Sequence, residues 1–539
     1  MNREFGDFQT PPLLVDAVLR CLSTLGKEWT RVIEPTCGRG NFIEGLLRQA
    51  RSPYEIQGIE VQDVHYTLAS GIARQSSKAN VVIRRANLFD LNLQRDLQWS
   101  RTGPLLVVGN PPWVTNAELG AIESNNLPEK TNLKGLRGLE ARTGKSNFDI
   151  AEYIWLKLIR ELALEQPTIA LLCKTSVARN VLQFAFDAGL PISKASIRKI
   201  DAKKWFGAAV EACLFCVEVG SGERQYAADI YEDIFATEPS SITGIVGKQL
   251  VADVKAYERV APVDGICPIT WRQGLKHDVA SVMELTYDNL GNLRNKLGET
   301  VIIEPDFVYP LLKGADLFSQ KNTGSRRVVI VTQKRLGENT CLLQRAAPQL
   351  WSYLTTHIDK FERRKSSIYH GQPSFAIFGI GDYSFAPYKV GISGLHKIPR
   401  FRAIGPIDGR PVMLDDTCYF IPCYSAEQAA FLTSLLNNPL CLDLINSIAF
   451  LDAKRPITKR LLQRIDLKTL YENVDRQALL VRANDELERL GIRLDQQEMT
   501  IDSAEGFLVE CLPDTGHRKQ AQYAMDVLFP DIMNVHSLS

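Results

Sequence analysis

Arg31-Val-Ile-Glu-Pro-Thr-Cys-Gly-Arg-Gly-Asn-Phe42 is the stretch that best indicates which fold this chain adopts. It has the pattern of a short buried strand, an acidic residue, a Gly-x-Gly loop and a helix over Phe42 to Leu47. Because glycine lacks a Cβ atom, Gly38 and Gly40 allow the backbone to pass close beneath a nucleoside. Position 43 is not glycine, so a dinucleotide pyrophosphate loop, Gly-x-Gly-x-x-Gly, is disfavoured.

Three further strand-like runs follow, and each ends in polar residues. Glu55 to Glu60 ends in a carboxylate, a group that typically binds ribose hydroxyls at this place. Asn80 to Asp90 ends in side chains able to read an adenine edge, and Pro104 to Gly109 runs directly into Asn110. In an open α/β sheet, ligands lie at the carboxyl ends of the strands. The sequence therefore predicts a nucleoside site there, with Glu34 holding the amino group of an amino-acid-bearing cofactor.

The tetrapeptide Asn110-Pro-Pro-Trp113 supplies the chemistry. Two prolines remove two backbone donors and fix φ, so the carbonyls before and between them stay free and rigidly aimed. The Asn110 side chain adds an acceptor, and Trp113 adds a flat π surface. Such a set accepts two hydrogen bonds from an exocyclic amine and stacks on its ring, which suits methyl transfer to a base amine. Taken alone, Asn-Pro-Pro is equally compatible with an ordinary turn; the neighbouring motifs decide against that interpretation.

With these motifs the chain resembles the S-adenosylmethionine-dependent amino-methyltransferases of DNA, specifically the gamma class of N6-adenine enzymes. The resemblance covers about the first 220 residues well. It is weaker beyond them, in Tyr309 to Gly314 and Ile380 to Lys389. It implies an α/β fold: a Rossmann-like class I methyltransferase domain, then a mixed α+β target-recognition domain and a helical carboxyl-terminal segment. With the shifts in composition, we expect a methyltransferase domain over 1–222, a connector over 223–262, a DNA target-recognition domain over 263–470 and the helical segment over 471–539.

The resemblance also implies roles for individual residues. Phe5 to Pro11 matches the segment that leads into the cofactor site, and Trp205-Phe206 precedes the strand Ala212 to Val219. At that position the family places an aromatic ring against the target base, and the spacing favours Phe206. The implied cofactor-binding residues are Thr10, Pro11, Glu34, Thr36, Gly38, Gly40, Phe42, Glu60, Asn87, Leu88 and Asn110. The implied catalytic residues are Asn110, Pro111, Pro112, Trp113 and Phe206.

Two residues depart from the family pattern. Asn87 stands where the family usually has an aspartate, although an amide oxygen still accepts a hydrogen bond from the adenine amine. Trp113 stands where Tyr or Phe is usual, which keeps the stacking surface and removes any phenolic hydrogen bond. The resemblance further places Phe148 and Asp149 in the adenosine pocket. The polar segment from Trp113 to Lys145 fits either a cover over the substrate or a plain surface loop.

A mechanism follows from these groups. A base inside a duplex cannot present its amine to a pocket, so the target must be flipped out. Asn110 Oδ1 and the Pro111 carbonyl then accept the two N–H bonds, which draws the nitrogen lone pair toward the methyl group. Trp113 stacks on the base and faces the sulfonium, and Phe206 covers the other face. Positioning supplies most of the catalysis, because the methyl donor is already activated.

Composition is that of an ordinary globular protein, with 539 residues, 45% hydrophobic and 23% charged. The amino terminus lacks an apolar signal region and no apolar run is long enough to span a bilayer, so we expect a cytoplasmic protein without membrane contact.

The 11 cysteines are scattered. Cys213 and Cys216 lie in one strand and point to opposite faces or nearly so, and no metal site is expected. The net charge of +1 does not itself indicate a polyanion partner, but clusters such as Arg363-Arg364-Lys365 offer local basic surface.

Other functions stay open at this point. Release-factor glutamine methyltransferases and some ribosomal RNA methyltransferases also carry Asn-Pro-Pro with an aromatic residue, but they are usually much shorter. N4-cytosine methylation and a non-catalytic DNA-recognition subunit of a defence complex are further alternatives. We expect double-stranded DNA as partner, in a restriction-modification or phage-defence system. No nuclease motif accompanies the methyltransferase motifs, which leaves a separate restriction nuclease or defence-system subunit open as a partner.

Overall fold

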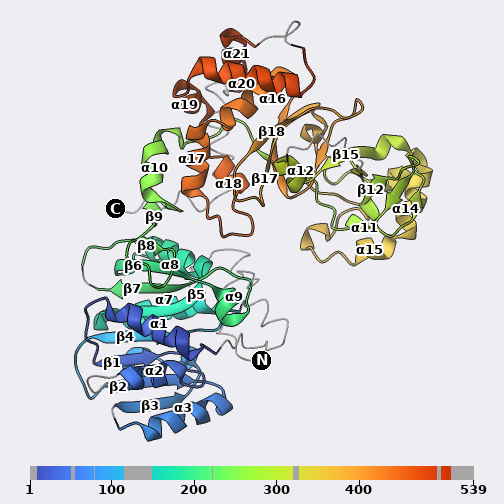
Figure 1. Ribbon diagram of the computed structural model, residues 1–539. Coiled ribbons are helices and arrows are strands. Elements are labelled where there is room, and N and C mark those ends of the chain that lie inside the picture. Colours follow the sequence, from blue (N-terminus) through green and yellow to red (C-terminus); the bar gives the residue numbers. More distant parts are fainter. Residues whose placement is uncertain are drawn as a thin grey trace, which may run out of the picture. The chain divides into compact units, whose positions relative to one another are not determined.

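A computed structural model describes residues 9–49, 55–77, 79–114, 149–220, 222–319, 327–493 and 499–511 (Figure 1). The chain divides into two compact units, Met1–Lys255 and Ala256–Ser539. Expectations for Phe5 to Phe8, for the segment after Val114 up to Phe148 and for the last residues of the chain lie outside the described part. Within it, the helices are all too short or too polar to cross a membrane.

The first unit is built on one ten-stranded sheet in the order β10-β9-β8-β6-β7-β5-β4-β1-β2-β3. The strands are β1 (Arg31–Glu34), β2 (Glu55–Glu60), β3 (Asn80–Arg85), β4 (Leu105–Gly109), β5 (Thr168–Lys174), β6 (Ile192–Ile200), β7 (Ala212–Val219), β8 (Ala227–Tyr231), β9 (Ser241–Val246) and β10 (Gln249–Val251). The strands β1 to β5 run parallel to one another, whereas β7 is antiparallel to β5 and β6. The strand order reverses beside β1, and this reversal places the ligand crevice between β1 and β4.

Helices cover both faces of this sheet (Figure 1). They are α1 (Pro12–Ser23), α2 (Asn41–Gln49), α3 (Asp63–Gln75), α4 (Leu93–Asp96), α7 (Ile150–Glu161), α8 (Thr175–Asp187) and α9 (Ala202–Phe206). The strand β7 is buried on both sides, so its residues alternate between two core clusters. Cys213 belongs to one cluster and Cys216 to the other, which confirms that they point to opposite faces. The Rossmann-like class I methyltransferase fold expected from the sequence is confirmed.

Residues 223–262, for which the sequence indicates a connector, mostly continue this sheet. Strand β8 pairs in parallel with β6, and β9 and β10 add antiparallel neighbours beyond it. The division between the units falls later, between Lys255 and Ala256, inside the helix α10 (Val254–Val260). These strands are short and only half-buried, so they lack the long apolar runs that marked β4 and β7 in the sequence.

The second unit mixes sheets and helices. A four-stranded sheet has the order β11-β20-β17-β18, and a six-stranded sheet has the order β14-β13-β12-β16-β15-β19. The strands are β11 (Arg272–Gln273), β12 (Glu284–Tyr287), β13 (Leu293–Asn295), β14 (Thr300–Val301), β15 (Val308–Leu312), β16 (Arg327–Ile330), β17 (Tyr388–Ser393), β18 (Phe401–Ile404), β19 (Met413–Leu414) and β20 (Cys418–Cys423). The pairings are antiparallel apart from β15 with β19.

Helices of the second unit lie both among its strands and after the last of them. After α10 they are α11 (Ala280–Met283), α12 (Gly314–Ser319), α13 (Leu343–Ala346), α14 (Pro348–Thr356), α15 (Ile358–Glu362), α16 (Ala426–Leu436), α17 (Pro439–Ile448), α18 (Lys459–Leu462), α19 (Leu467–Glu472), α20 (Arg476–Arg489) and α21 (Ile501–Cys511). Ser425 begins α16 as a helix cap: its hydroxyl accepts from the Gln428 N–H at 3.2 Å. The Gln428 side chain accepts in turn from the Tyr424 N–H at 3.0 Å, so the cap is reciprocal.

Candidate functional site

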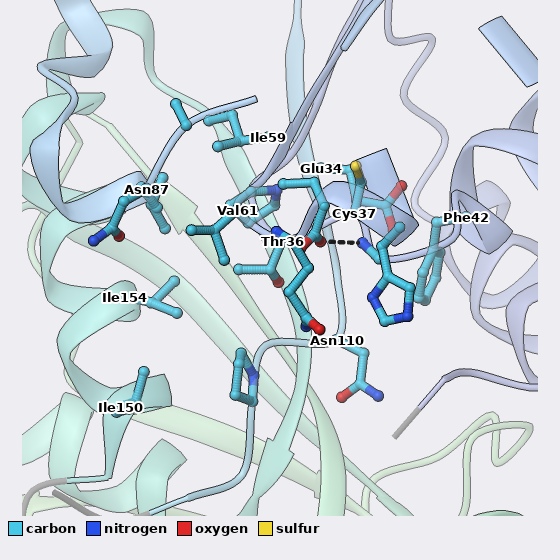
Figure 2. A pocket seen from close by; sticks show the side chains of 18 of the residues that line it. Glu34, Thr36, Cys37, Phe42, Ile59, Val61, Asn87, Asn110, Ile150 and Ile154 are labelled. Carbon is cyan, nitrogen blue, oxygen red and sulfur yellow. Dashed lines mark hydrogen bonds between the residues drawn. The ribbon is translucent and has the colours of Figure 1, made fainter. Parts of the chain in front are cut away.

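A cavity opens at the carboxyl ends of β1, β2 and β4 in the first unit (Figure 2). It encloses about 950 Å³ of space, part of which is open to solvent. Its walls contain nine of the residues predicted to bind cofactor: Thr10, Glu34, Thr36, Gly38, Phe42, Glu60, Asn87, Leu88 and Asn110. Pro11 and Gly40 do not line it, although Pro11 precedes the first residue of α1 and Gly40 lies in the glycine loop. The cavity is therefore built where the strand order reverses, from the motifs that the sequence singled out.

The glycine loop needs its glycines. Gly38 and Gly40 have φ of +52° and +87°, a region that other residues rarely adopt. A Cβ atom at Gly38 would lie 3.0 Å from the amide of Gln9, and one at Gly40 would lie 3.1 Å from Ile72 Cδ1. The positive φ angles therefore favour glycine at both positions, and a side chain there would also have to displace these neighbouring side chains.

The segment before α1 is tied to that loop. The Asn41 side-chain amide donates to the Thr10 carbonyl at 2.7 Å, and the Arg39 N–H donates to Gln9 Oε1 at 3.2 Å. Thr10 is buried and reaches the cavity together with Gln9. These contacts explain why residues that precede α1, and belong to no strand, contribute to the same site as the ends of the strands.

Glu60, at the end of β2, is buried and held by two backbone donors. The Gly38 N–H donates to one carboxylate oxygen and the Gln62 N–H donates to the other, each at 2.8 Å. Each oxygen keeps a second lone pair, so the carboxylate can still accept from a pair of ligand hydroxyls. The same contacts link the glycine loop to the end of β2, so Glu60 supports the loop.

Glu34, at the end of β1, is the most isolated acid of the site. Only 2% of its surface is exposed, and its Oε2 atom has no hydrogen-bond partner among the described residues. Burial raises the pKa of Glu34 well above its usual value; the Ile43 N–H opposes this shift, and the neighbouring Glu60 adds to it. A buried carboxylate with an oxygen that accepts no hydrogen bond raises the free energy of the folded protein. The arrangement therefore suits a ligand that brings a positive charge.

Asn87 lies on the opposite wall in Figure 2. Its Oδ1 accepts from the Phe89 N–H at 3.1 Å, which caps the short 3-10 helix Leu88–Asp90. This bond fixes the plane of the amide. Leu88 is buried and lines the same wall. An amide with one donor and one acceptor edge is complementary to adenine, which presents an amine donor beside a ring-nitrogen acceptor.

The tetrapeptide Asn110 to Trp113 follows β4, and it is divided between the cavity and the core. Asn110 and Pro112 line the cavity, whereas Pro111 is buried beside them. Trp113 is only 5% exposed, and its Nε1 donates to the Leu172 carbonyl at 3.4 Å. Asn110 and Pro112 therefore face the cavity, and the indole of Trp113 belongs to the core in this state.

The structure brings Trp113 and Phe206 together, as the sequence predicts, but in direct contact. Their ring centroids lie 5.1 Å apart with an interplanar angle of 72°, an edge-to-face pair. A base sandwiched between two parallel rings needs a separation of roughly 7 Å, because each stacked contact takes about 3.5 Å. Phe206 is the last residue of α9 and Gly207 follows with φ of +66°. The pair has no room for a base in this arrangement.

Some functional neighbours were missed or assigned differently from sequence. Ile150 and Ile154 of α7 line the cavity, and the sequence did not single them out. Asp149 does not line it: its carboxylate accepts from Lys174 Nζ at 2.7 Å and from the Ala151 N–H at 3.1 Å, capping α7. The Ile150 N–H also donates to the Val114 carbonyl at 3.0 Å, joining α7 to the end of the tetrapeptide segment.

The fold and this site together define the class of the protein. A class I sheet whose first parallel strands end in a glycine loop, a ribose-type acid and an Asn-Pro-Pro segment is that of an S-adenosylmethionine-dependent methyltransferase. The buried open acceptor of Glu34 fits the cationic cofactor that such an enzyme uses.

Comparison with known proteins identifies the family. No family model matches the chain. The Type II methyltransferase M.NspV of Nostoc sp. is 38% identical over 476 residues, which make up 87% of this chain and 97% of that protein. The chain therefore belongs to the Type II methyltransferase family, the DNA-modifying enzymes of restriction-modification systems. A solved structure of the Type IIL restriction-modification enzyme MmeI in complex with DNA covers 92% of this chain and 74% of its own, with a TM-score of 0.51 and 13% identity, and so shares the fold.

Proposed function

We propose that this chain is a sequence-specific DNA adenine-N6 methyltransferase that flips its target base and transfers a methyl group from S-adenosylmethionine. The observation that carries the proposal is that Asn110 and Pro112 line the same cavity as Glu34 and Glu60. An amine held by the tetrapeptide would thus face the space in which the methyl donor binds. A separate restriction nuclease is the partner that such a modification enzyme would accompany.

The cofactor is assigned to the cavity by the charges and shapes of its walls. Glu34 would hold the ammonium group, because its open Oε2 lies in a buried place. Glu60 would accept from the ribose hydroxyls, and the amide of Asn87 would read the adenine edge. Thr10, Thr36 and Phe42 would border the methionine portion and close it from water. S-adenosylmethionine supplies an activated methyl group, so these residues need only bind and orient it.

The transfer step is assigned to the two acceptors of the tetrapeptide. Asn110 Oδ1 and the Pro111 carbonyl would accept the two amine N–H bonds, and Pro111 and Pro112 offer no backbone N–H of their own. Two acceptors aimed at one amine pull its lone pair out of the ring and toward the methyl group. Fixed acceptors of this kind act on the transition state without reorganisation.

The aromatic residues would act only after a rearrangement. Since Trp113 and Phe206 now touch edge to face, the target base would enter when Phe206 leaves this contact. Phe206 ends the short helix α9 beside Gly207, a place where small backbone rotations are tolerated. The base would then lie against Trp113, with Phe206 on its other face.

Reading of the DNA sequence is assigned to the second unit, in line with the target-recognition domain expected over 263–470. Lys360, Arg363 and Lys365 surround a hollow there, together with Asp278. Arg364 is different, because it donates to the carbonyls of Phe361, Ser374 and Ala376 at 3.0, 2.9 and 2.7 Å. We therefore assign phosphate contact to Arg363 and Lys365 and a structural role to Arg364.

The decisive experiment offers the purified chain three substrates in parallel, with labelled cofactor: duplex DNA, ribosomal RNA and a release factor. Label in DNA, on adenine N6 within one short motif, is the expected result. Asn110→Ala should retain cofactor binding and lose on the order of a hundredfold or more in rate, as when one donor of an oxyanion hole is removed. Label in cytosine, RNA or protein, or near-wild-type turnover by Asn110→Ala, contradicts the proposal.

A further inference from the structure

The loop of residues 394–400 joins β17 to β18, and its first residues are firmly anchored. The Gly394 N–H donates to the Thr417 carbonyl at 2.8 Å. Ser393 Oγ accepts from the Leu395 N–H at 3.3 Å and hydrogen-bonds with His396 Nδ1 at 2.7 Å. A Cβ atom at Gly394 would lie 2.9 Å from the ring of Tyr419, so the loop begins in close contact with β20.

The second half of the loop is held as well. The ring of His396 stacks on Phe318 of α12, with centroids 4.2 Å apart and planes 11° from parallel. The guanidinium of Arg400 lies 5.4 Å from the same ring. Beyond the loop, Phe401 exchanges two hydrogen bonds with the Asn437 side chain, at 2.9 and 2.8 Å. Figure 1 shows α12 beside β17 and β18, and the loop is a rigid feature of this corner of the second unit.

The side chains that this rigid loop exposes are apolar and cationic. Leu395 and Ile398 are 39% and 61% exposed, and Lys397 and Arg400 are exposed beside them. Residues 393–400 contain no aspartate or glutamate. A single exposed apolar residue needs no explanation, but two on one ordered loop, interleaved with cations, indicate a partner that is both apolar and anionic.

Further cations gather next to the loop. The carbonyl of Ile457 lies 3.1 Å from the position of a Cβ atom at Gly394, so the segment around 454–460 runs alongside. Lys454 and Lys459 are exposed on that segment. Partial burial lowers the pKa of Lys459, and the like charge of Arg272 lowers it further. One cation of this segment is already paired, because Arg455 contacts the Asp416 carboxylate at 2.9 Å. The exposed lysines that remain favour a polyanion as a neighbour.

We propose that the 394–400 loop is a DNA-reading contact, in which Ile398 and Leu395 enter a groove of the duplex while Lys397 meets a phosphate. Apolar side chains of this size contact sugars and base edges in grooves, and flanking cations set their register on the backbone. The inference rests on the proposed function for its partner, duplex DNA, and it names the surface that meets it. It is independent of the hollow formed by Arg363 and Lys365.

The test uses the full-length protein and plasmid DNA from cells without adenine methylation, with a fluorescent duplex fragment of it for binding. Ile398→Ala should weaken DNA binding about tenfold with no change in the salt dependence, because an apolar contact releases no counterion. Lys397→Ala should weaken binding and lower the slope of log Kd against log salt by about one. Val481→Ala is the matched control, since Val481 on α20 is 62% exposed and should change neither quantity.

Each outcome decides the inference. Wild-type DNA affinity in both Ile398→Ala and Lys397→Ala overturns it, whether or not the wild type methylates DNA. An equal loss in Val481→Ala, or a lowered melting temperature that accounts for the loss, also overturns it. If the wild type binds and methylates DNA while the two loop variants match it, the inference fails and the proposed function stands. If the wild type binds DNA through the loop but labels only RNA or protein, the loop contact stands and the proposed function fails.

Discussion

Replacing Glu34 with glutamine separates the charge of this side chain from its shape. The carboxylate is buried, its pKa is raised and one of its oxygens lacks a partner among the described residues. In the ligand-free protein the ionised form is therefore held at a cost, which a bound ammonium group would offset. Glu34→Gln keeps nearly the same volume and removes the charge, so it should weaken the cofactor complex without harming the free protein.

The expected loss of cofactor binding free energy is that of one hydrogen bond to a charged group, which contributes about 1.5–3 kcal/mol. Since each 1.4 kcal/mol is a factor of ten, Kd for S-adenosylmethionine should rise between about tenfold and about a hundredfold. Isothermal titration calorimetry measures this directly. Methylthioadenosine, which lacks the amino-acid portion, should bind the wild type and Glu34→Gln equally well. An exposed glutamate of α2 gives the matched variant, Glu44→Gln, which should leave both affinities unchanged.

The pH dependence has a definite sign. Because the pKa of Glu34 is raised on folding, the folded protein binds more protons than the unfolded chain between the ordinary and the raised value. Stability of the ligand-free wild type should fall as pH rises through that window, and Glu34→Gln should lose this dependence. Cofactor affinity of the wild type should rise over the same window, as the carboxylate ionises. Unchanged cofactor affinity in Glu34→Gln, or an equal loss for methylthioadenosine, would refute the reasoning.

Three further changes test other parts of the molecule. Glu60→Ala should weaken S-adenosylmethionine binding by roughly 1.5–3 kcal/mol in calorimetry, and an unchanged Kd would count against a ribose contact. Lys389 is 1% exposed, and burial lowers its pKa to about 7. The unfolded chain therefore binds more protons above that pH, and denaturation should show the wild type gaining about 2 kcal/mol relative to Lys389→Met between pH 7 and pH 9; a constant difference would exclude a shifted lysine. Joint replacement of Arg363 and Lys365 by alanine should lower the salt slope of DNA binding by about two, whereas Arg364→Ala should chiefly lower the melting temperature, and the reverse pattern would overturn both roles.

The sequence predicted the bounds of elements in the first unit closely where an apolar run marked a buried strand. The strand Ala212 to Val219 was expected with the bounds that β7 has, because a strand buried on both faces is apolar throughout. The helix expected over Phe42 to Leu47 lies inside α2. The glycine loop and the acids placed at the strand ends also meet at one cavity, since topology alone brings the ends of parallel strands together.

What sequence could not provide depends on side-chain packing between distant segments. The edge-to-face contact of Trp113 with Phe206 is set by the core beneath them, and a motif gives ring identity without ring orientation. Arg364 was grouped with its basic neighbours because its partners are backbone carbonyls, which leave no trace in a sequence. The strands β8 to β10 escaped notice because they are short and their faces are only half-buried.

The hydrogen bond between Ile150 and Val114 has a practical consequence for engineering. It joins Val114, directly after the tetrapeptide, to Ile150, the first residue of α7, at 3.0 Å, so these two residues lie side by side. Lengthening the chain that connects two adjacent points adds only about 0.6 kcal/mol of closure entropy for each doubling of its length. A fluorophore-bearing peptide or a small folded module could therefore be grafted between these two residues, as a reporter placed directly beside the chemistry.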